Sequence, residues 1–137
     1  MDCGPTCLRI VARFYGKHYN LQTLLERCYI TREGVSMLGI SRAAESIGFR
    51  SMWVKITFEQ LLSEAPLPAI VHWNQSHFVV VYKITGKKGK ELIHVSDPGG
   101  GLVSFPREEF IRCWASTAEE GIKQGVGLLL ETTPDFY

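Results

Sequence analysis

The stretch Asp2-Cys3-Gly4-Pro5-Thr6-Cys7-Leu8 opens the chain and predicts a helix that begins at a thiol. Apolar positions continue at helical spacing through Val11 and Phe14. Pro5 suits a first helical turn, because its missing N–H costs no hydrogen bond there. We therefore expect Cys3 to lie at the N-terminus of a helix whose apolar stripe packs into a core.

More helices are expected in the first half of the chain, each from a capping residue followed by apolar spacing. Asn20 and Ser36 each precede such a stretch, and the first helix and the one capped by Ser36 are expected to end at Gly16 and Gly48. Thr57-Phe58-Glu59-Gln60 has the spacing of a capping box, in which two side chains satisfy the first N–H groups of a helix.

The second half alternates short β-branched and aromatic runs with turn residues, which is typical of antiparallel strands. Strands are expected at 49–56, 68–73, 77–85, 92–96, 102–105 and 127–131, with a short helix opening at Pro106. The polar, glycine-flanked segment 86–90 predicts a hairpin turn. Helices first and an antiparallel sheet second give an α+β fold class.

The composition is that of an ordinary globular protein. The chain has 137 residues, 45% of them hydrophobic and 21% charged, which suits a single domain over residues 1–137. The formal net charge is only +1, so nothing in the charge balance favours nucleic acid as a partner. No apolar run reaches the length of a membrane span, and the chain as given is expected to be soluble.

The cysteines argue for a reducing compartment rather than a disulfide framework. The four thiols, at positions 3, 7, 28 and 113, have irregular spacing, and no Cys-x-x-Cys pair is present. Zinc ligands usually come in such closely spaced pairs. We therefore expect no metal and no cofactor.

Three residues together suggest thiol chemistry. Cys3 is a candidate nucleophile, because a helix N-terminus and a neighbouring imidazolium both favour the thiolate. His77, at the start of an apolar strand, would be the base that later protonates the leaving amine. Asp97 would orient the imidazole. A hairpin turning at 86–90 would bring His77 and Asp97 onto neighbouring strands.

Each residue also has a purely structural interpretation. A lone cysteine at a helix start is more often a small buried apolar residue, and an aspartate before proline most often forms a turn. Cys7 is a rival nucleophile one turn further along, although its place on the stripe with Val11 predicts a core position. His72 has two interpretations, a place beside the site or packing within a strand, and the second is expected. The residues alone therefore support a cysteine hydrolase only as a hypothesis.

Five segments, in order, carry a family resemblance. They are 2–8 (DCGPTCL), 34–40 (GVSMLGI), 67–73 (LPAIVHW), 77–80 (HFVV) and 95–98 (VSDP). Together they resemble the amino-terminal peptidase domain of bacteriocin-processing ABC exporters, over nearly the whole chain. The resemblance implies a papain-like fold in which Cys3 matches the nucleophile, His77 the base and Asp97 the orienting acid.

The resemblance also implies a substrate, partners and a location. The family cuts a leader from a peptide precursor after a Gly-Gly pair, on the cytoplasmic face of the bacterial plasma membrane. The attached transmembrane and ATP-binding parts then export the mature peptide. We therefore expect this chain to be the peptidase fragment of such an exporter. Export itself is not expected to reside in it.

One departure from the family pattern affects the expected activity. The family carries a glutamine a few residues before the nucleophile, and its amide helps to form the oxyanion hole. Here only Met1 and Asp2 precede Cys3, which we interpret as a chain that begins after that glutamine. Losing one oxyanion donor typically costs about 10²–10³ in turnover. The alternatives are a weakly active or non-catalytic leader-binding domain, or another papain-like hydrolase such as an amidase.

Glycine offers no side chain to grip, so affinity for a leader must come from elsewhere on the peptide. An apolar groove that receives an amphipathic leader helix would supply it. Met37 and Leu38 are weak candidates for such a groove, and core packing is the expected place of each.

Overall fold

The computed structural model describes residues 3–28, 36–74 and 77–137. Its helices are α1 Cys3–Phe14, α2 Leu21–Arg27, α3 Met37–Ser46, α4 Phe58–Glu64 and α5 Arg107–Trp114, with a short 3₁₀ turn at Pro134–Phe136. Its strands are β1 Phe49–Thr57, β2 Ala69–Trp73, β3 His77–Thr85, β4 Leu92–Asp97, β5 Gly101–Pro106, β6 Ala115–Glu119 and β7 Ile122–Thr132.

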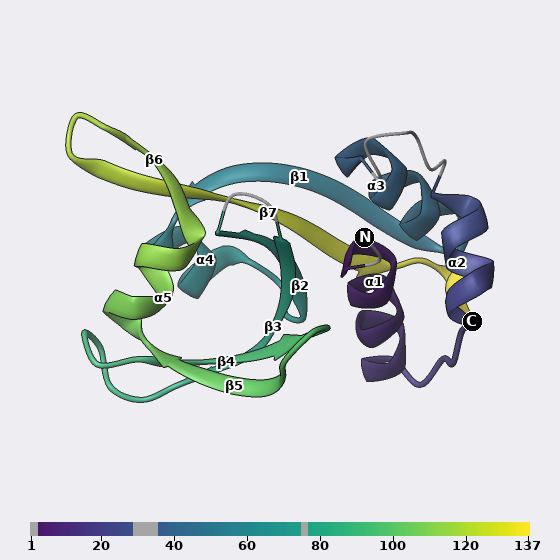
Figure 1. Cartoon of the computed structure of the whole chain (residues 1–137), viewed down its shortest axis with the longest axis horizontal. Coiled ribbons are helices and arrows are strands. Elements are labelled where there is room, and N and C mark those ends of the chain that lie inside the picture. The colour runs from purple at the N-terminus through teal and green to yellow at the C-terminus, as the bar shows by residue number, and fades with distance from the viewer. Residues whose placement is uncertain (1–2, 29–35, 75–76) are drawn as a thin grey trace.

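The described strands form one antiparallel sheet in the order β1-β7-β2-β3-β4-β5, with β6 paired to the outer part of β7. The long strands β1 and β7 run side by side across the molecule, from the helices α1–α3 at one end to α4 and α5 at the other (Figure 1). The strands β3, β4 and β5 are joined as successive neighbours, as the expected hairpin requires.

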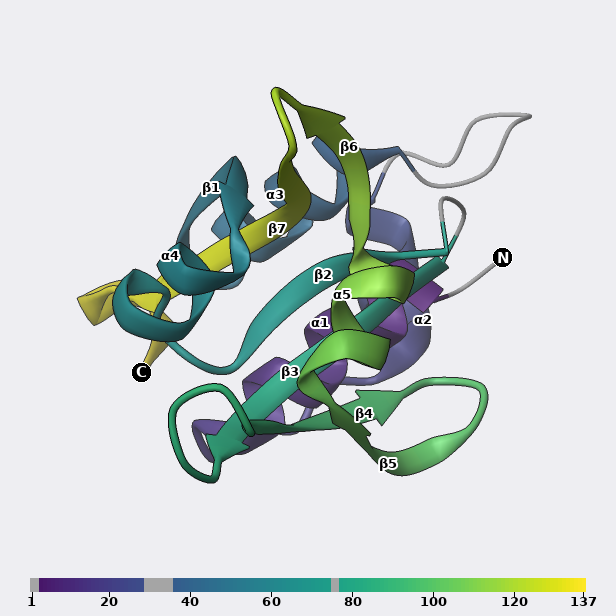
Figure 2. The same cartoon turned by 90° about the vertical axis from the view of Figure 1, so that its left-hand side faces the viewer.

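Two apolar clusters lie on opposite faces of the sheet. On one face, α1, α2 and α3 pack against β3 and the ends of β1 and β7, with Leu8, Val11 and Ile40 fully buried. On the other face, α4 and α5 cover Val79, Val81 and further residues of β2–β4. Figure 2 shows α5 in front of the sheet and α1 behind it. The helical first part thus packs on an antiparallel sheet, which confirms the α+β class.

The helix boundaries follow from the capping residues. The side chain of Asn20 accepts a hydrogen bond from the N–H of Gln22, and that of Ser36 accepts one from the N–H of Gly39. Thr57 and Gln60 form the complete capping box at the start of α4. These caps were all expected, because each satisfies N–H groups that a helix start leaves without partners.

The C-terminal strands were only partly predicted. The expected strand 127–131 is the inner part of the longer β7, and β6 had no counterpart in the prediction. The segment Ala115–Glu119 lacks the alternating apolar residues of a half-buried strand, and it is a strand because it pairs with β7. Gly125 lies directly under the Trp114 ring, where a side chain would have no room. Neither the pairing of β6 with β7 nor the packing of Trp114 on Gly125 leaves a signal in the local sequence.

Candidate active site

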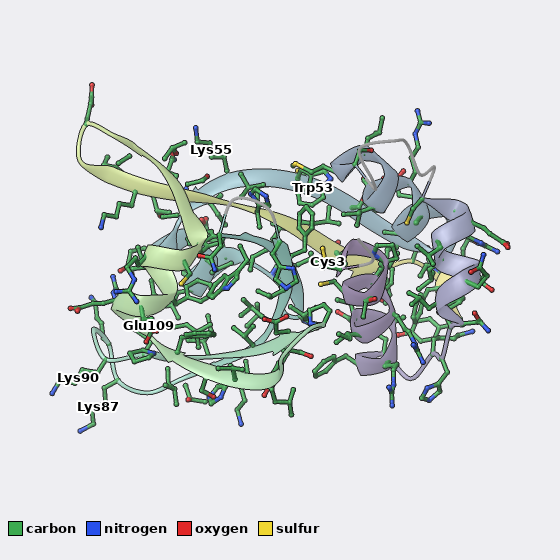
Figure 3. All side chains as sticks on the ribbon, viewed as in Figure 1. Cys3, Trp53, Lys55, Lys87, Lys90 and Glu109 are labelled. Atoms are coloured by element: carbon green, nitrogen blue, oxygen red, sulfur yellow. The ribbon has the colours of Figure 1, made fainter. Side chains whose placement is uncertain are left out.

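Cys3 lies in the first turn of α1, on the side that faces the strands (Figure 3). It is partly buried and packs against the cluster that α1 shares with α2 and α3. Its neighbour Gly4 touches the side chain of Ile40 so closely that a larger residue would have to displace it. The glycine thereby lets the start of α1 dock on α3, and the docking fixes the position of the thiol.

His77 and Asp97 belong to neighbouring strands. Val80 pairs with Ser96, so the register places Asp97 opposite Val79, two residues along the same face from His77. Such a diagonal pair is within reach of long side chains. The expected hairpin therefore does bring these two residues together.

A hydrogen bond joins the two side chains, with 2.8 Å between His77 Nε2 and Asp97 Oδ1. Each side chain is 27% exposed, so the pair borders solvent. The same Oδ1 accepts a hydrogen bond from the N–H of Gly99 at 2.9 Å. Because Nε2 is engaged by the carboxylate, the ring nitrogen left for another partner is Nδ1.

Asp97 is held in its ionised form. Partial burial pushes the pKa of its carboxyl upward, but the hydrogen bonds from His77 and from the N–H groups of Gly99 and Gly100, with the charge of His77, outweigh it. The net result is an Asp97 pKa below the ordinary value. A carboxylate whose charged form is favoured can then fix the orientation of the imidazole.

The contacts of Cys7 tie α1 to the His77 strand. Its thiol donates a hydrogen bond to the carbonyl of Phe78, with 3.3 Å between Sγ and oxygen. Cys3 lies one helical turn before Cys7, on the same face of the helix. Cys3 therefore lies one helical turn from the contact that joins α1 to the strand of His77.

Cys7 itself is a core residue, as expected. It is fully buried, and its pKa is raised well above the ordinary value by burial and, to a lesser degree, by the negative charges of Cys3 and Asp97. Burial also raises the pKa of Cys28 to about 11. Cys113 is partly buried against the second cluster. Among these four thiols, Cys3 is the one in the first turn of α1.

An aromatic row beside the site was missed from the sequence. Trp53 of β1 has its ring centroid 6.0 Å from that of Phe78, and the centroid of the His72 ring lies 5.2 Å from that of Phe78. His72 thus packs within its strand, as expected. Nothing in the mixed stretch 49–56 distinguished Trp53 from an ordinary strand residue, since its neighbours come from distant segments.

The expectation for the start of α3 was wrong. Met37 and Leu38 were expected in the core, but they are 38% and 59% exposed. The helix turns Gly39, Ile40 and Ala43 inward instead. The apolar side chains at its first turn are therefore left on the surface.

A helix that begins at a thiol, packed on an antiparallel sheet that carries a His–Asp pair, is the arrangement of a papain-like cysteine peptidase. The sequence model of the peptidase C39 family matches residues 1–119, and the chain belongs to this family. The expected resemblance to the peptidase domains of bacteriocin-processing exporters is thereby confirmed.

The relatives are much longer proteins. The transport/processing ATP-binding protein ComA of Streptococcus pneumoniae is 31% identical over 139 residues, which cover 99% of this chain and 18% of ComA. The probable microcin-H47 secretion/processing ATP-binding protein MchF of Escherichia coli is 30% identical over 96% of this chain and 18% of its own length. The chain spans less than a fifth of these relatives.

Solved structures share the fold. A double glycine motif protease from an AMS/PCAT transporter, in complex with a leader peptide, superposes with a TM-score of 0.80 at 30% identity, covering 96% of this chain and 85% of that one. The peptidase domain of Streptococcus ComA, a bi-functional ABC transporter of a quorum-sensing pathway, gives 0.75 at 25% identity, covering 96% and 92%. These matches confirm the papain-like fold.

Proposed function

We propose that this chain removes the leader of a secreted peptide precursor by cutting after a Gly-Gly pair, with Cys3 as nucleophile, His77 as base and Asp97 as orienting acid. The observation that carries the proposal is the bond between His77 and Asp97, placed beside the helix that bears Cys3. The relatives add support, since they are processing proteins or double glycine motif proteases.

The first half of the reaction forms an acyl-enzyme. His77 Nδ1 takes the proton of the Cys3 thiol, and Sγ attacks the carbonyl carbon of the second glycine. As the tetrahedral intermediate collapses, the C–N bond breaks and the imidazolium gives its proton to the leaving amine. The leader is then held as a thioester on Cys3, and the mature peptide departs with a free N-terminus.

The second half releases the leader. Water loses a proton to His77 and attacks the thioester carbon, and the C–S bond breaks. The leader leaves as a carboxylic acid, and the Cys3 sulfur regains a proton from the imidazolium. Asp97 stays ionised throughout and keeps Nε2 as the bonded nitrogen, so that Nδ1 is always the one that transfers protons.

The start of α1 supplies electrostatic help. Its N–H groups and helix dipole carry a partial positive charge of about half an elementary charge. That charge favours the thiolate form of a cysteine in the first turn. A backbone N–H at this end can also donate to the oxyanion of the tetrahedral intermediate.

The leader is proposed to bind the exposed apolar residues around the start of α3. Met37, Leu38 and Met52 are 38%, 59% and 60% exposed, although they are apolar. The indole of Trp53 donates a hydrogen bond to the carbonyl of Met37, which places the start of α3 beside the aromatic row. An amphipathic leader helix could cover them.

Membership of an exporter is also part of the proposal. The relatives are ATP-binding transport proteins of which this chain spans a small part. We propose that the chain acts together with transmembrane and ATP-binding parts, at the cytoplasmic face of the bacterial plasma membrane. No helix among the described residues is both long and apolar enough to cross a bilayer.

Cleavage and binding can be separated with two cysteine variants. A synthetic precursor with a Gly-Gly leader is incubated with the chain under reducing conditions, and the masses of its products are measured by mass spectrometry. We expect one cut after the second glycine, its loss in Cys3→Ala, and retained peptide binding in that variant. Cys113→Ala, which changes a remote thiol, should cut normally.

Unchanged cutting by Cys3→Ala would refute the role of Cys3. Peptide binding with no product from the unchanged chain would instead favour a leader-binding module.

A further inference from the structure

We propose that Trp53 restricts the two substrate residues before the scissile bond to glycine. This inference rests on the proposed peptidase function and assigns a specificity-determining residue to it. Trp53 would act as a fixed wall beside Cys3, against which any side chain on those two residues collides.

Three sets of contacts hold the indole in place. Nε1 donates to the carbonyl of Met37 at 2.9 Å. The ring packs against Phe78, with centroids 6.0 Å apart and planes tilted by 53°. The side chain also packs against the same buried cluster as Cys3. A tryptophan held by a hydrogen bond and by packing against a buried cluster moves little when a substrate binds.

Two independent routes place Trp53 close to Cys3. The first route runs through the helices. Trp53 is hydrogen-bonded to Met37 at the start of α3, and Ile40, about one turn further along, contacts Gly4, the residue after Cys3. Through the sheet, Trp53 packs against Phe78, whose carbonyl accepts a hydrogen bond from Cys7, one turn along α1 from Cys3. Figure 3 shows the indole of Trp53 extending from β1 toward Cys3.

The sheet order indicates which part of the substrate meets this wall. His77 lies on β3. On one side of β3 is β4, which carries Asp97, and on the other side β2 and β7 lead to β1, which carries Trp53. The leaving amine must lie beside the His77 ring, which Asp97 holds toward β4. The residues that remain attached to Cys3 Sγ therefore extend the other way, toward α3 and Trp53.

This direction agrees with the proposed leader site. The acyl part of the substrate is the leader, and the exposed Met37 and Leu38 begin α3, to which the Trp53 indole is bonded. The leader would thus dock by its apolar face and pass its last two residues between Trp53 and the start of α1. Glycine fits in this passage because it has no Cβ.

The test compares substrates rather than total activity. Precursors ending in Gly-Gly, Gly-Ala and Ala-Gly before the cut are supplied to the unchanged chain, to Trp53→Ala and to Trp53→Phe, and kcat/KM is measured for each. One extra methyl group in a tight site changes kcat/KM by about 10–200-fold. We expect the preference for Gly-Gly to fall about tenfold or more in Trp53→Ala and by less in Trp53→Phe.

Trp114→Phe is the matched control. Trp114 also donates its indole N–H to a carbonyl, that of Val126 at 3.1 Å, but it lies in the cluster under α5. This variant loses the same kind of bond and should lower stability without changing the substrate ratio. Replacing the residue after the cut should leave the Trp53→Ala effect unchanged.

A substrate ratio that stays the same in both Trp53 variants would overturn the inference, as would a change confined to the residue after the cut. The preference for Gly-Gly can also be measured without turnover. Leaders that end in Gly-Gly or Gly-Ala chloromethyl ketone alkylate Cys3, and the ratio of the two alkylation rates gives the preference. Failure of the unchanged chain to cut any precursor would count against the proposed function. The ratio of the two alkylation rates would still test whether Trp53 restricts the substrate.

Discussion

At the scale of single residues, the candidate site depends on one hydrogen bond between strands. His77 and Asp97 are twenty residues apart, and 2.8 Å separates Nε2 from Oδ1. The sequence allowed this pair to be predicted, because both the turn at 86–90 and the apolar strands on each side have strong local signals. The structure adds that Nε2 is the bonded ring nitrogen, which leaves Nδ1 for another partner.

Asp97→Asn should lower kcat far more than it weakens peptide binding. The amide can keep the shape of the bond but no longer stabilises an imidazolium, and a comparable change in another catalytic triad costs about 10⁴ in turnover. Initial rates and peptide affinity, measured on the same preparation, check this. Asp135→Asn, at an exposed position, is the control. A less than threefold loss in kcat would contradict the assigned role.

Asp97 should also make stability depend on pH. Its pKa in the folded chain is lowered, so the bond with His77 contributes fully above the unfolded value of about 3.9. This contribution should be lost as the pH falls through the folded pKa. Urea unfolding between pH 3 and pH 6 should show a steeper loss in the unchanged chain than in Asp97→Asn. Parallel curves would contradict the account.

At the scale of elements, Arg107 ties three of them together. From the first turn of α5, its guanidinium pairs with Glu59 of α4 and with Glu91, 3.1 Å away, just before β4. It also lies 4.6 Å from the Phe58 ring centroid. Because the side chain of Glu91 is only 3% exposed, this network supports the hairpin that carries His77 and Asp97.

Removing that support should be costly. Arg107→Ala leaves the nearly buried Glu91 without its partner, so the melting temperature should fall clearly, by several degrees at least. Arg112→Ala removes a 76%-exposed arginine paired with Glu109 three residues away, and such surface pairs contribute little. Equal melting temperatures for the two variants, measured by circular dichroism, would show that the network does not stabilise the hairpin.

At the scale of the whole molecule, the helices and the β3–β4 hairpin were predictable, whereas the long-range pairing was not. Caps such as Ser36 act within a few residues and leave a local signature. The pairing of β1 with β7 places Phe49 opposite Thr132, and no local sequence pattern predicts it. Trp53 was missed for the same reason, because its significance lies in contacts with α3 and β3.

The core under α1 carries much of the fold. Leu8 is fully buried in the cluster that positions the start of α1. Leu8→Ala should reduce the free energy of unfolding by about 2–5 kcal/mol, because it removes buried methyl groups and leaves a cavity. Leu102→Ala, at a 74%-exposed position, should change it by about 0.5 kcal/mol or less. Equal effects in urea titrations would contradict this packing.

The most direct test of the central claim is to trap the leader on Cys3. A leader peptide that ends in a Gly-Gly chloromethyl ketone, which forms a stable thioether with loss of chloride, is incubated with the chain, and the modified residue is located by mass spectrometry of proteolytic fragments. The account predicts one adduct on Cys3, formed at least tenfold more slowly in Asp97→Asn and absent in Cys3→Ala. An adduct on Cys7, Cys28 or Cys113, or equal rates in the unchanged chain and Asp97→Asn, would contradict it.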